Sequence, residues 1–262
     1  MKQLLFILII SLFTVNANAT GVIVLEGHYQ GKNIYVQNPF AENGVGFCTF
    51  EITINGEVTT DEVNSSAYEI DFSSRNLKIG DPVIVKIKHK EDCNPKVLNP
   101  EVLKPKSTFE IVSMNISKDG KFDWKTKNET GILTFIVEQF RWSKWIKVGE
   151  VDGNGKITES NYSFKVTPHS GENKFRVKQF DYSGKPRYSS ASRYISTFKE
   201  MSFSPKKAKT EVFFTNQTLF EVYDSYGNIV KKGFGEKVNI SNLKKGIYYL
   251  NYDNKTDTFI KK

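Results

Sequence analysis

Residues 219–262 read LFEVYDSYGNIVKKGFGEKVNISNLKKGIYYLNYDNKTDTFIKK, and in this stretch short apolar runs alternate with turn residues and lysines. Aromatic and β-branched residues suit the pleated, half-buried surface of a strand. Five segments have this strand-like composition: 220–224, 229–232, 238–240, 247–252 and 256–261. The stretch therefore predicts a small β-domain at this end of the chain.

Glycines mark the turns of this domain. Gly227 and Gly246 each precede a strand-like segment, and turns often need the positive φ that glycine adopts without steric cost. Leu243, in the loop before Gly246, is predicted to fill the core. From Lys199 onward there are twelve Lys and seven Asp or Glu, so five of the eight net positive charges lie here. Solvated strand faces and edge lysines that oppose aggregation account for this charge.

The first twenty residues have the features of an export signal. Lys2 gives a positive start, and the apolar run 4–15 is too short to span a bilayer. A small-residue cleavage site follows, so we expect cleavage between Ala19 and Thr20. No Cys follows this site, which argues against a lipid anchor, and no later apolar run has the length of a transmembrane helix. The mature chain is expected outside the cytoplasm.

The chain contains two cysteines, Cys48 and Cys93. In an exported protein an even number of cysteines favours a disulfide, which here would close a loop of about 45 residues. The alternative is a pair of buried free thiols. The sequence therefore predicts one bridge, with the reduced pair left open.

Residues 20–112 are predicted to form an antiparallel β-sandwich. Apolar residues alternate with polar ones at 50–54 and 67–72. Asn55-Gly56, directly after the first of these segments, is a strong signal for a hairpin. No stretch of ten or more residues holds a helical period.

Three prolines, Pro95, Pro100 and Pro105, interrupt the segment 94–106. Spaced prolines are incompatible with a helix interior or a central strand. We expect an extended segment whose apolar residues are buried and which covers an edge of the first sandwich.

Residues 113–198 are predicted to form a second sandwich, which leaves 199–262 as the third domain. Strand-like segments recur within 113–198: 121–125, 133–140, 144–151, 161–166 and 174–180. About seven short strands with turns every eight to twelve residues are typical of an immunoglobulin-like sandwich.

Several segments of this second unit carry a resemblance: Trp124, FIVEQF at 135–140, WIKVGEV at 145–151, YSF at 162–164 and FRVKQFDYSGK at 175–185. They resemble the fibronectin type III-like domains that precede the C-terminal sorting domain in secreted Bacteroidetes proteins. Most of these residues are core and turn positions. The resemblance implies a spacer or adhesion module without an active site.

The end of the chain resembles the C-terminal sorting domain of the type IX secretion system. The matching residues are Val222, Tyr223, Asp224, Gly227, Val230, Leu243, Gly246, Tyr248, Lys261 and Lys262. The family usually opens on an Asn-Pro pair followed by Gly and Glu, whereas this chain has Ser204-Pro205 without them. The resemblance implies an immunoglobulin-like sandwich read by the outer-membrane secretion machinery. It also implies cargo that is cleaved and attached to lipopolysaccharide, or released.

Motifs for catalysis or metal binding are absent from the sequence. His28, His89 and His169 lie in separate stretches without metal-ligand spacing, and no hydrolase, metalloprotease or phosphate-loop motif occurs. The run DGNG at 152–155 resembles the start of a calcium loop but lacks its full set of acids, so a hairpin turn is the simpler interpretation. We predict no enzyme activity, no cofactor and no metal.

Two further binding hypotheses come from composition. Trp142, Trp145 and Tyr162 are candidates for an exposed aromatic platform for sugars, although such residues more often fill a sandwich core. The net charge of +8 would suit an anionic partner. Because the lysines are spread among 29 acids and no nucleic-acid module is present, we expect no nucleic acid among the partners.

Three functions are left open by the sequence. The first is a non-enzymatic protein exported by the type IX route that acts at the cell surface in binding, adhesion or signalling. The second is a periplasmic or outer-membrane-associated accessory component that keeps its C-terminal domain. The third is a glycan-binding module.

Overall fold

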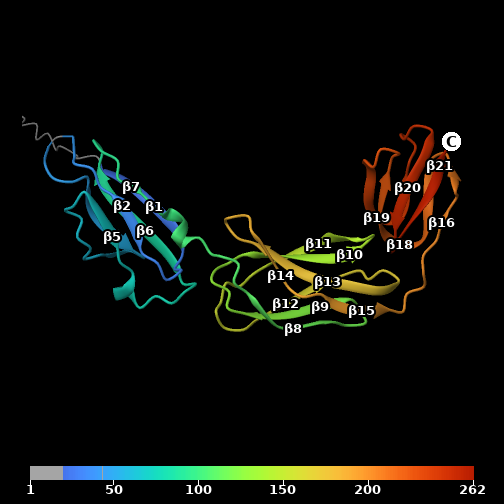
Figure 1. Ribbon diagram of the computed structural model, residues 1–262, viewed down its shortest axis with the longest axis horizontal. Coiled ribbons are helices and arrows are strands. Elements are labelled where there is room, and N and C mark those ends of the chain that lie inside the picture. Colours follow the sequence, from blue (N-terminus) through green and yellow to red (C-terminus); the bar gives the residue numbers. More distant parts are fainter. Residues whose placement is uncertain (1–19, 43) are drawn as a thin grey trace, which may run out of the picture. The chain divides into compact units, whose positions relative to one another are not determined.

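The protein is described by a computed structural model that covers residues 20–42 and 44–262 (Figure 1). The predicted export signal, including Ala19 of the cleavage site, lies outside these residues. The fold is all-β, as predicted, and the described residues contain two short 3₁₀ helices, Ser73–Arg75 and Pro100–Leu103. No helix among them is both long and apolar enough to cross a membrane.

The chain divides into two compact units. The first holds the described residues up to Gly27 together with Gly31–Leu77 and Pro82–Leu103, and the second holds His28–Gln30, Lys78–Asp81 and Lys104–Lys262. The expected boundary at residue 112 therefore differs from the division at Leu103. Phe109 explains this difference, because its ring packs in the second unit, 5.1 Å from that of Phe135. The finer division into three domains stays a proposal.

The described residues of the first unit form seven strands in two sheets. One sheet has the order β1-β6-β3-β4 and the other the order β5-β2-β7. The strands are β1 (Thr20–His28), β2 (Ile34–Gln37), β3 (Thr49–Ile54), β4 (Glu57–Val58), β5 (Ala67–Ile70), β6 (Pro82–Lys90) and β7 (Lys96–Val97).

Alternation of period two builds the core of this unit. On β6, Val83, Val85 and Ile87 are buried while Ile84 between them is exposed. The Asn-Gly hairpin is confirmed between β3 and β4: Asn55 has φ 51° and Gly56 has φ 89°, the positive values that a tight two-residue turn requires.

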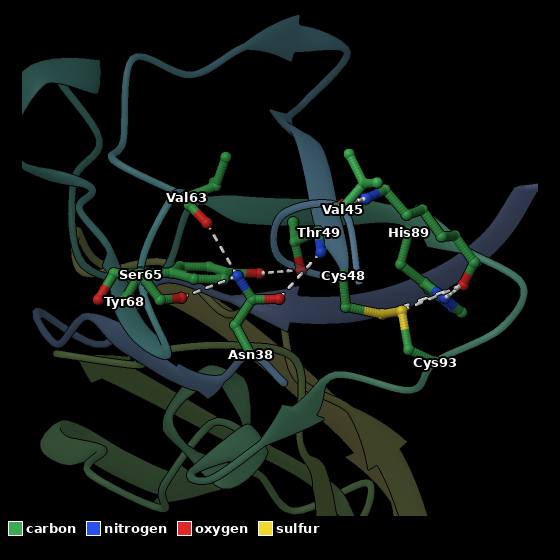
Figure 2. The surroundings of a disulfide bond; sticks show 10 residues. Asn38, Val45, Cys48, Thr49, Val63, Ser65, Tyr68, His89 and Cys93 are labelled. Carbon is green, nitrogen blue, oxygen red and sulfur yellow. Dashed lines mark hydrogen bonds between the residues drawn. A yellow bond between two sulfur atoms is a disulfide. The ribbon is translucent and has the colours of Figure 1, made fainter. Parts of the chain in front are cut away.

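The disulfide between Cys48 and Cys93 is confirmed (Figure 2). Their Cα atoms are 5.8 Å apart, inside the usual range for a bridge, and both residues are buried. The bridge joins the start of β3 to the segment after β6. The alternative of two free thiols is therefore excluded.

Next to the bridge, the fully buried side chain of Asn38 ties three segments together (Figure 2). Its amide nitrogen donates to the carbonyls of Val63 and Ser65, at 2.8 and 3.0 Å. Its amide oxygen accepts from the backbone nitrogen of Thr49 at 2.9 Å. These bonds give hydrogen-bond partners to three backbone groups from the segment 63–65 and the start of β3.

The proline-containing segment behaves only partly as expected. Lys96–Val97 pairs with β2 as the edge strand β7, so this part covers a sheet edge. The next residues are not extended, because Pro100–Leu103 forms a 3₁₀ helix. Proline is tolerated at the first position of a helix, where its missing N–H would have no partner, and the helix buries Leu103.

In the second unit, residues 110–196 form a sandwich that we call the middle sandwich. Its sheets have the orders β12-β9-β8 and β11-β10-β13-β14, and β15 also pairs with β13. The strands are β8 (Glu110–Ile116), β9 (Lys121–Lys127), β10 (Thr134–Arg141), β11 (Lys144–Asp152), β12 (Ser160–Lys165), β13 (Gly171–Phe180), β14 (Pro186–Tyr188) and β15 (Ser192–Ser196). The core between the sheets is largely aromatic, with Phe122, Trp124, Phe135 and Phe175 fully buried.

Residues 199–262, which we call the C-terminal domain, form the other part of the second unit. They contain β16 (Phe203–Ser204), β17 (Lys207–Ala208), β18 (Glu211–Tyr223), β19 (Ile229–Asn239), β20 (Gly246–Tyr252) and β21 (Lys255–Lys261). These strands form a sheet of order β16-β18-β20-β21-β17, with β19 paired to β18. The domain has a hydrophobic core of its own, which includes Val222, Leu250 and Phe259.

Candidate functional site: the C-terminal domain and its junction with the middle sandwich

The sequence-predicted sorting residues divide between the core and the turns of the C-terminal domain. Val222 and Tyr248 are buried in the core, and Val230 and Leu243 pack against it. Lys261 is also buried, and its ammonium donates to the carbonyl of Lys262 at 3.0 Å. Most of these side chains therefore shape the domain and are not displayed on its surface.

Asp224 and Gly227 lie in the hairpin turn between β18 and β19, whereas Gly246 is the first residue of β20. The carboxylate of Asp224 accepts from the backbone nitrogens of Tyr226 and Asn228, both at 2.9 Å. Gly227 has φ 84° and Gly246 has φ 155°, so both occupy backbone conformations that L-residues rarely adopt. The sequence predicted this requirement at both glycines.

Replacing both glycines tests how far the fold of this domain determines sorting. No atom lies within 4 Å of the position that a Cβ would occupy at Gly227 or Gly246, so the cost of valine comes from the backbone alone. We expect Gly227→Val and Gly246→Val each to cost about 1–2 kcal/mol. A domain of about 60 residues has little stability to lose, so the double variant should lose surface exposure, measured with protease on whole cells.

The control exchanges the exposed Lys244 and Lys245 for Gln, which removes charge without straining the backbone. If this lysine variant lost surface exposure while the glycine variant kept it, charge and not the fold would be the signal.

Arg141, at the end of β10, is the largest buried cation of the second unit, with an exposed fraction of 1%. Within the middle sandwich its guanidinium donates to Gln139 Oε1 at 2.7 Å and to the Thr167 carbonyl at 2.8 Å. Its third bond crosses to the C-terminal domain, where Nη1 donates to the Asp253 carbonyl at 3.1 Å. Burial lowers the pKa of Arg141 to about 10 and the Asp253 charge opposes this shift, so the group is a cation at neutral pH.

Asp253, in the turn between β20 and β21, is the counterpart of Arg141 and is also 1% exposed. Its carboxylate accepts from the backbone nitrogen of Ser170 at 2.8 Å and from the Ser170 hydroxyl. The backbone nitrogen of Met201 donates to the same carboxylate at 3.2 Å. One carboxylate thus joins the middle sandwich, the chain entering the C-terminal domain and the β20–β21 turn.

The turn between β10 and β11 meets this β20–β21 turn. Trp142 and Ser143 both have positive φ, 52° and 61°, which makes a tight hairpin turn without glycine. The backbone nitrogen of Trp142 donates to Asn254 Oδ1 at 3.3 Å, and its indole nitrogen donates to the Tyr252 carbonyl at 3.4 Å.

An ion pair completes these contacts, which together we call the junction. Lys144 Nζ lies 2.7 Å from Glu221 Oε2 and 2.8 Å from the Tyr223 hydroxyl, which itself donates to Glu221 at 2.6 Å. Burial alone would raise the pKa of Glu221, but the hydrogen bonds from Lys144 and Tyr223 outweigh it and lower the pKa. Tyr223 is thus a predicted sorting residue that also contacts the middle sandwich.

Apolar packing across the junction is incomplete. A hollow of about 280 Å³ lies between the two parts of the second unit, lined by Val148, Phe164 and Val166 on one side and Leu219 and Phe234 on the other. The polar residues Gln139, Lys147, Lys165 and Thr167 complete the lining of this hollow.

His169 lies beside the junction and is 1% exposed. Its Nδ1 donates to the Ser170 carbonyl at 2.7 Å. Burial lowers the pKa of His169 and the Arg141 charge lowers it further, while the backbone hydrogen bonds to Ser170 and Phe140 and the Asp253 charge oppose the shift only in part.

The lowered pKa of His169 predicts that acid destabilises the second unit. A histidine whose folded pKa is lowered contributes its full stability above its unfolded pKa of about 6.5 and loses that contribution as the pH falls. Unfolding followed by Trp fluorescence should therefore show a loss of stability between about pH 7.5 and pH 5.5. All three Trp residues lie in the second unit, so the signal reports this unit alone.

His169→Asn removes the titrating group and keeps a side-chain donor for the Ser170 carbonyl. This variant should show a flatter stability profile over the same pH range. An unchanged profile would mean that another group causes the acid sensitivity.

The aromatic platform for which Trp142, Trp145 and Tyr162 were candidates does not form, and Tyr162 fills the core, which was the favoured alternative. Tyr162 is buried and stacks on Trp124 in the core, at 5.4 Å between ring centroids. The ring of Trp145 instead lies 4.1 Å from the Arg176 guanidinium carbon, and the ring of Tyr188 lies 4.2 Å from it. The three rings therefore share no exposed surface, which removes the feature that suggested glycan binding.

Glu129 holds the glycine-rich loop 152–155 in place of the calcium site that the loop resembles. This carboxylate is 3% exposed and accepts from the Tyr162 hydroxyl at 2.7 Å and from the Gly155 nitrogen at 3.0 Å. Within the described ranges, no group of three His, Cys, Asp or Glu side chains is placed to hold a metal ion. His28, His89 and His169 belong to no such group.

Sequence reasoning missed the residues that build the junction. Arg141 and Asp253 are 112 positions apart, and neither belongs to a motif. A basic residue at the end of a strand usually points to solvent, so no local pattern distinguishes Arg141. Among the contacting residues, Tyr223 was predicted as a sorting residue and Trp142 as part of an aromatic platform, so both were singled out for other reasons.

Comparisons with known proteins agree with the resemblance of the C-terminal domain. Residues 204–262 match the family described as secretion system C-terminal sorting domain. The resemblance predicted from the sequence of this domain is thus confirmed. No curated protein matches the chain.

Three solved structures align with most of the chain at low similarity. The chicken CNTN1 FN1-FN3 domains align at 11% identity over 91% of this chain and 98% of theirs, with a TM-score of 0.28. A tetra-tandem repeat from the extending region of a large adhesion protein gives 13% identity, 92% and 73% coverage and a TM-score of 0.29. Dimeric latent PorU from Porphyromonas gingivalis gives 11% identity, 92% and 31% coverage and a TM-score of 0.24. These TM-scores are too low for any of the three structures to support a conclusion about the fold or function of this protein.

Proposed function

We propose that the protein is exported by the type IX route, with residues 199–262 as its sorting domain, and acts outside the cell as a non-enzymatic binding, adhesion or signalling module. The match of residues 204–262 to the sorting-domain family carries this proposal. Two observations support it. The predicted sorting residues form the core and turns of one domain, and the disulfide fits an oxidising compartment.

The non-enzymatic part of the proposal is supported by how the buried charges are used. Glu129, Arg141 and Asp253 direct their polar atoms to neighbouring protein groups, where they hold a loop and the junction. Groups engaged in this way are structural. The first unit and the middle sandwich are then the parts that meet a partner.

The partner of the C-terminal domain in this proposal is the outer-membrane secretion machinery. In this proposal the machinery recognises the folded domain, whose core and turns are formed by the predicted sorting residues from Val222 to Lys262. Attachment to lipopolysaccharide, or release, would follow if the domain is removed after export.

A second candidate is an envelope component that keeps its C-terminal domain as a working part, at the outer membrane or in the periplasm. The junction favours this candidate, because it fastens the domain to the middle sandwich through buried polar contacts.

Protease accessibility on whole cells tests the proposal. The full chain should be degraded from outside, and a chain that lacks residues 199–262 should be protected. Equal accessibility of the two chains would refute the sorting role.

A further inference from the structure

We propose that the middle sandwich carries a docking site for the β20–β21 turn. This site would hold the C-terminal domain even when the chain between the two is cut. The inference rests on the proposed function, since it concerns the fate of the sorting domain. It states that cutting the connecting segment does not by itself release residues 199–262. A sorting domain cut from this protein would stay on it until the junction is broken.

The contacts that carry this inference are independent of the connecting segment. Seven hydrogen bonds cross from the middle sandwich to the C-terminal domain. On the middle sandwich the donors belong to Arg141, Trp142, Lys144 and Ser170, and every acceptor lies between Glu221 and Asn254. Both surfaces lie within folded sheets and their turns, so neither needs the link to be positioned.

The charges of the two surfaces are complementary and partly shielded from water. Arg141 and Lys144 supply two cations on one side, and Asp253 and Glu221 supply two carboxylates on the other. The side chain of Glu221 is 13% exposed, and Arg141 and Asp253 are each 1% exposed. Hydrogen bonds in which one partner is charged are roughly twice as strong as neutral ones, and burial reduces screening by salt.

The connecting segment is open to cleavage. Residues 197–200 are all exposed, and the buried chain resumes at Met201. Met201 bonds to Asp253 within the C-terminal domain, so a cut before it leaves that contact intact. A protease can therefore separate the covalent chain without touching the junction.

The test uses the full chain with a recognition sequence for a site-specific protease inserted between Phe198 and Lys199. After cutting, both fragments should elute together in size-exclusion chromatography and be found together by mass spectrometry. Lys144→Glu places two carboxylates together and should weaken the complex of the cut fragments by about tenfold or more. Combining Lys144→Glu with Glu221→Lys restores opposite charges and should restore co-elution.

The matched control is Asp257→Ala. Asp257 lies on β21, near Asp253, but bonds to Tyr252 and Lys206 within the C-terminal domain and makes no bond to the middle sandwich. This variant should co-elute like the unchanged protein. Separation of the cut wild-type fragments, with the C-terminal fragment still folded by circular dichroism, would overturn the inference. The inference would also be overturned if combining Lys144→Glu with Glu221→Lys failed to restore co-elution. Neither result bears on whether the domain directs export.

Discussion

Replacing Cys48 and Cys93 together by Ser is expected to destabilise the first unit by about 4 kcal/mol. The bridge spans 45 residues, and a crosslink of this length removes much of the conformational freedom of the unfolded chain. Both cysteines are buried, so serine hydroxyls in their place also lack the apolar contacts of the disulfide. For a domain of this size the loss corresponds to roughly 20 °C in melting temperature.

Calorimetry of the full chain measures this effect, since it records the unfolding of both units. Tryptophan fluorescence of the same sample is the internal control. Every Trp lies in the second unit, so the fluorescence transition should be unchanged in the double serine variant. Wild-type protein treated with a reductant should behave like the variant. A shift of less than about 1 kcal/mol would show that the bridge adds little to the stability of the unit.

Removal of residues 199–262 is expected to abolish export beyond the periplasm. This segment carries the whole match to the sorting-domain family and all the residues that the sequence analysis singled out for sorting. Fractionation should find the shortened chain in the periplasm, with its disulfide formed. Deletion also uncovers Arg141 and Lys144, so solubility of the shortened chain should be checked in the same fractions. Appearance of the shortened chain in the medium would contradict the prediction.

Local patterns in the sequence predicted the elements of the fold because each has a local cause. On β6 the side chains alternate between the core and the surface, with Val83 and Val85 buried and Ile84 exposed, as expected of a strand with one buried face. The Asn55-Gly56 turn followed from the need for positive φ at both residues. The disulfide followed from an even cysteine count and an expected oxidising compartment.

Features that depend on contacts distant in sequence escaped prediction. The predicted domain boundary was residue 112, whereas the first compact unit ends at Leu103, because Phe109 packs in a core built by later strands. Tyr162 was a candidate for an exposed platform, and cross-strand packing on Trp124 buries it. Arg141 and Asp253 meet across 112 residues, and only the folded second unit brings them together.

We expect residues 199–262 to take this protein to the cell surface. This claim is tested by digestion of the first unit with added protease on intact cells, followed with an antibody against that unit, for the full chain and for the chain ending at Phe198. The full chain should be digested and the shortened chain should be protected. Digestion of both chains at the same rate would contradict the claim and leave the C-terminal domain as an ordinary structural part of the second unit.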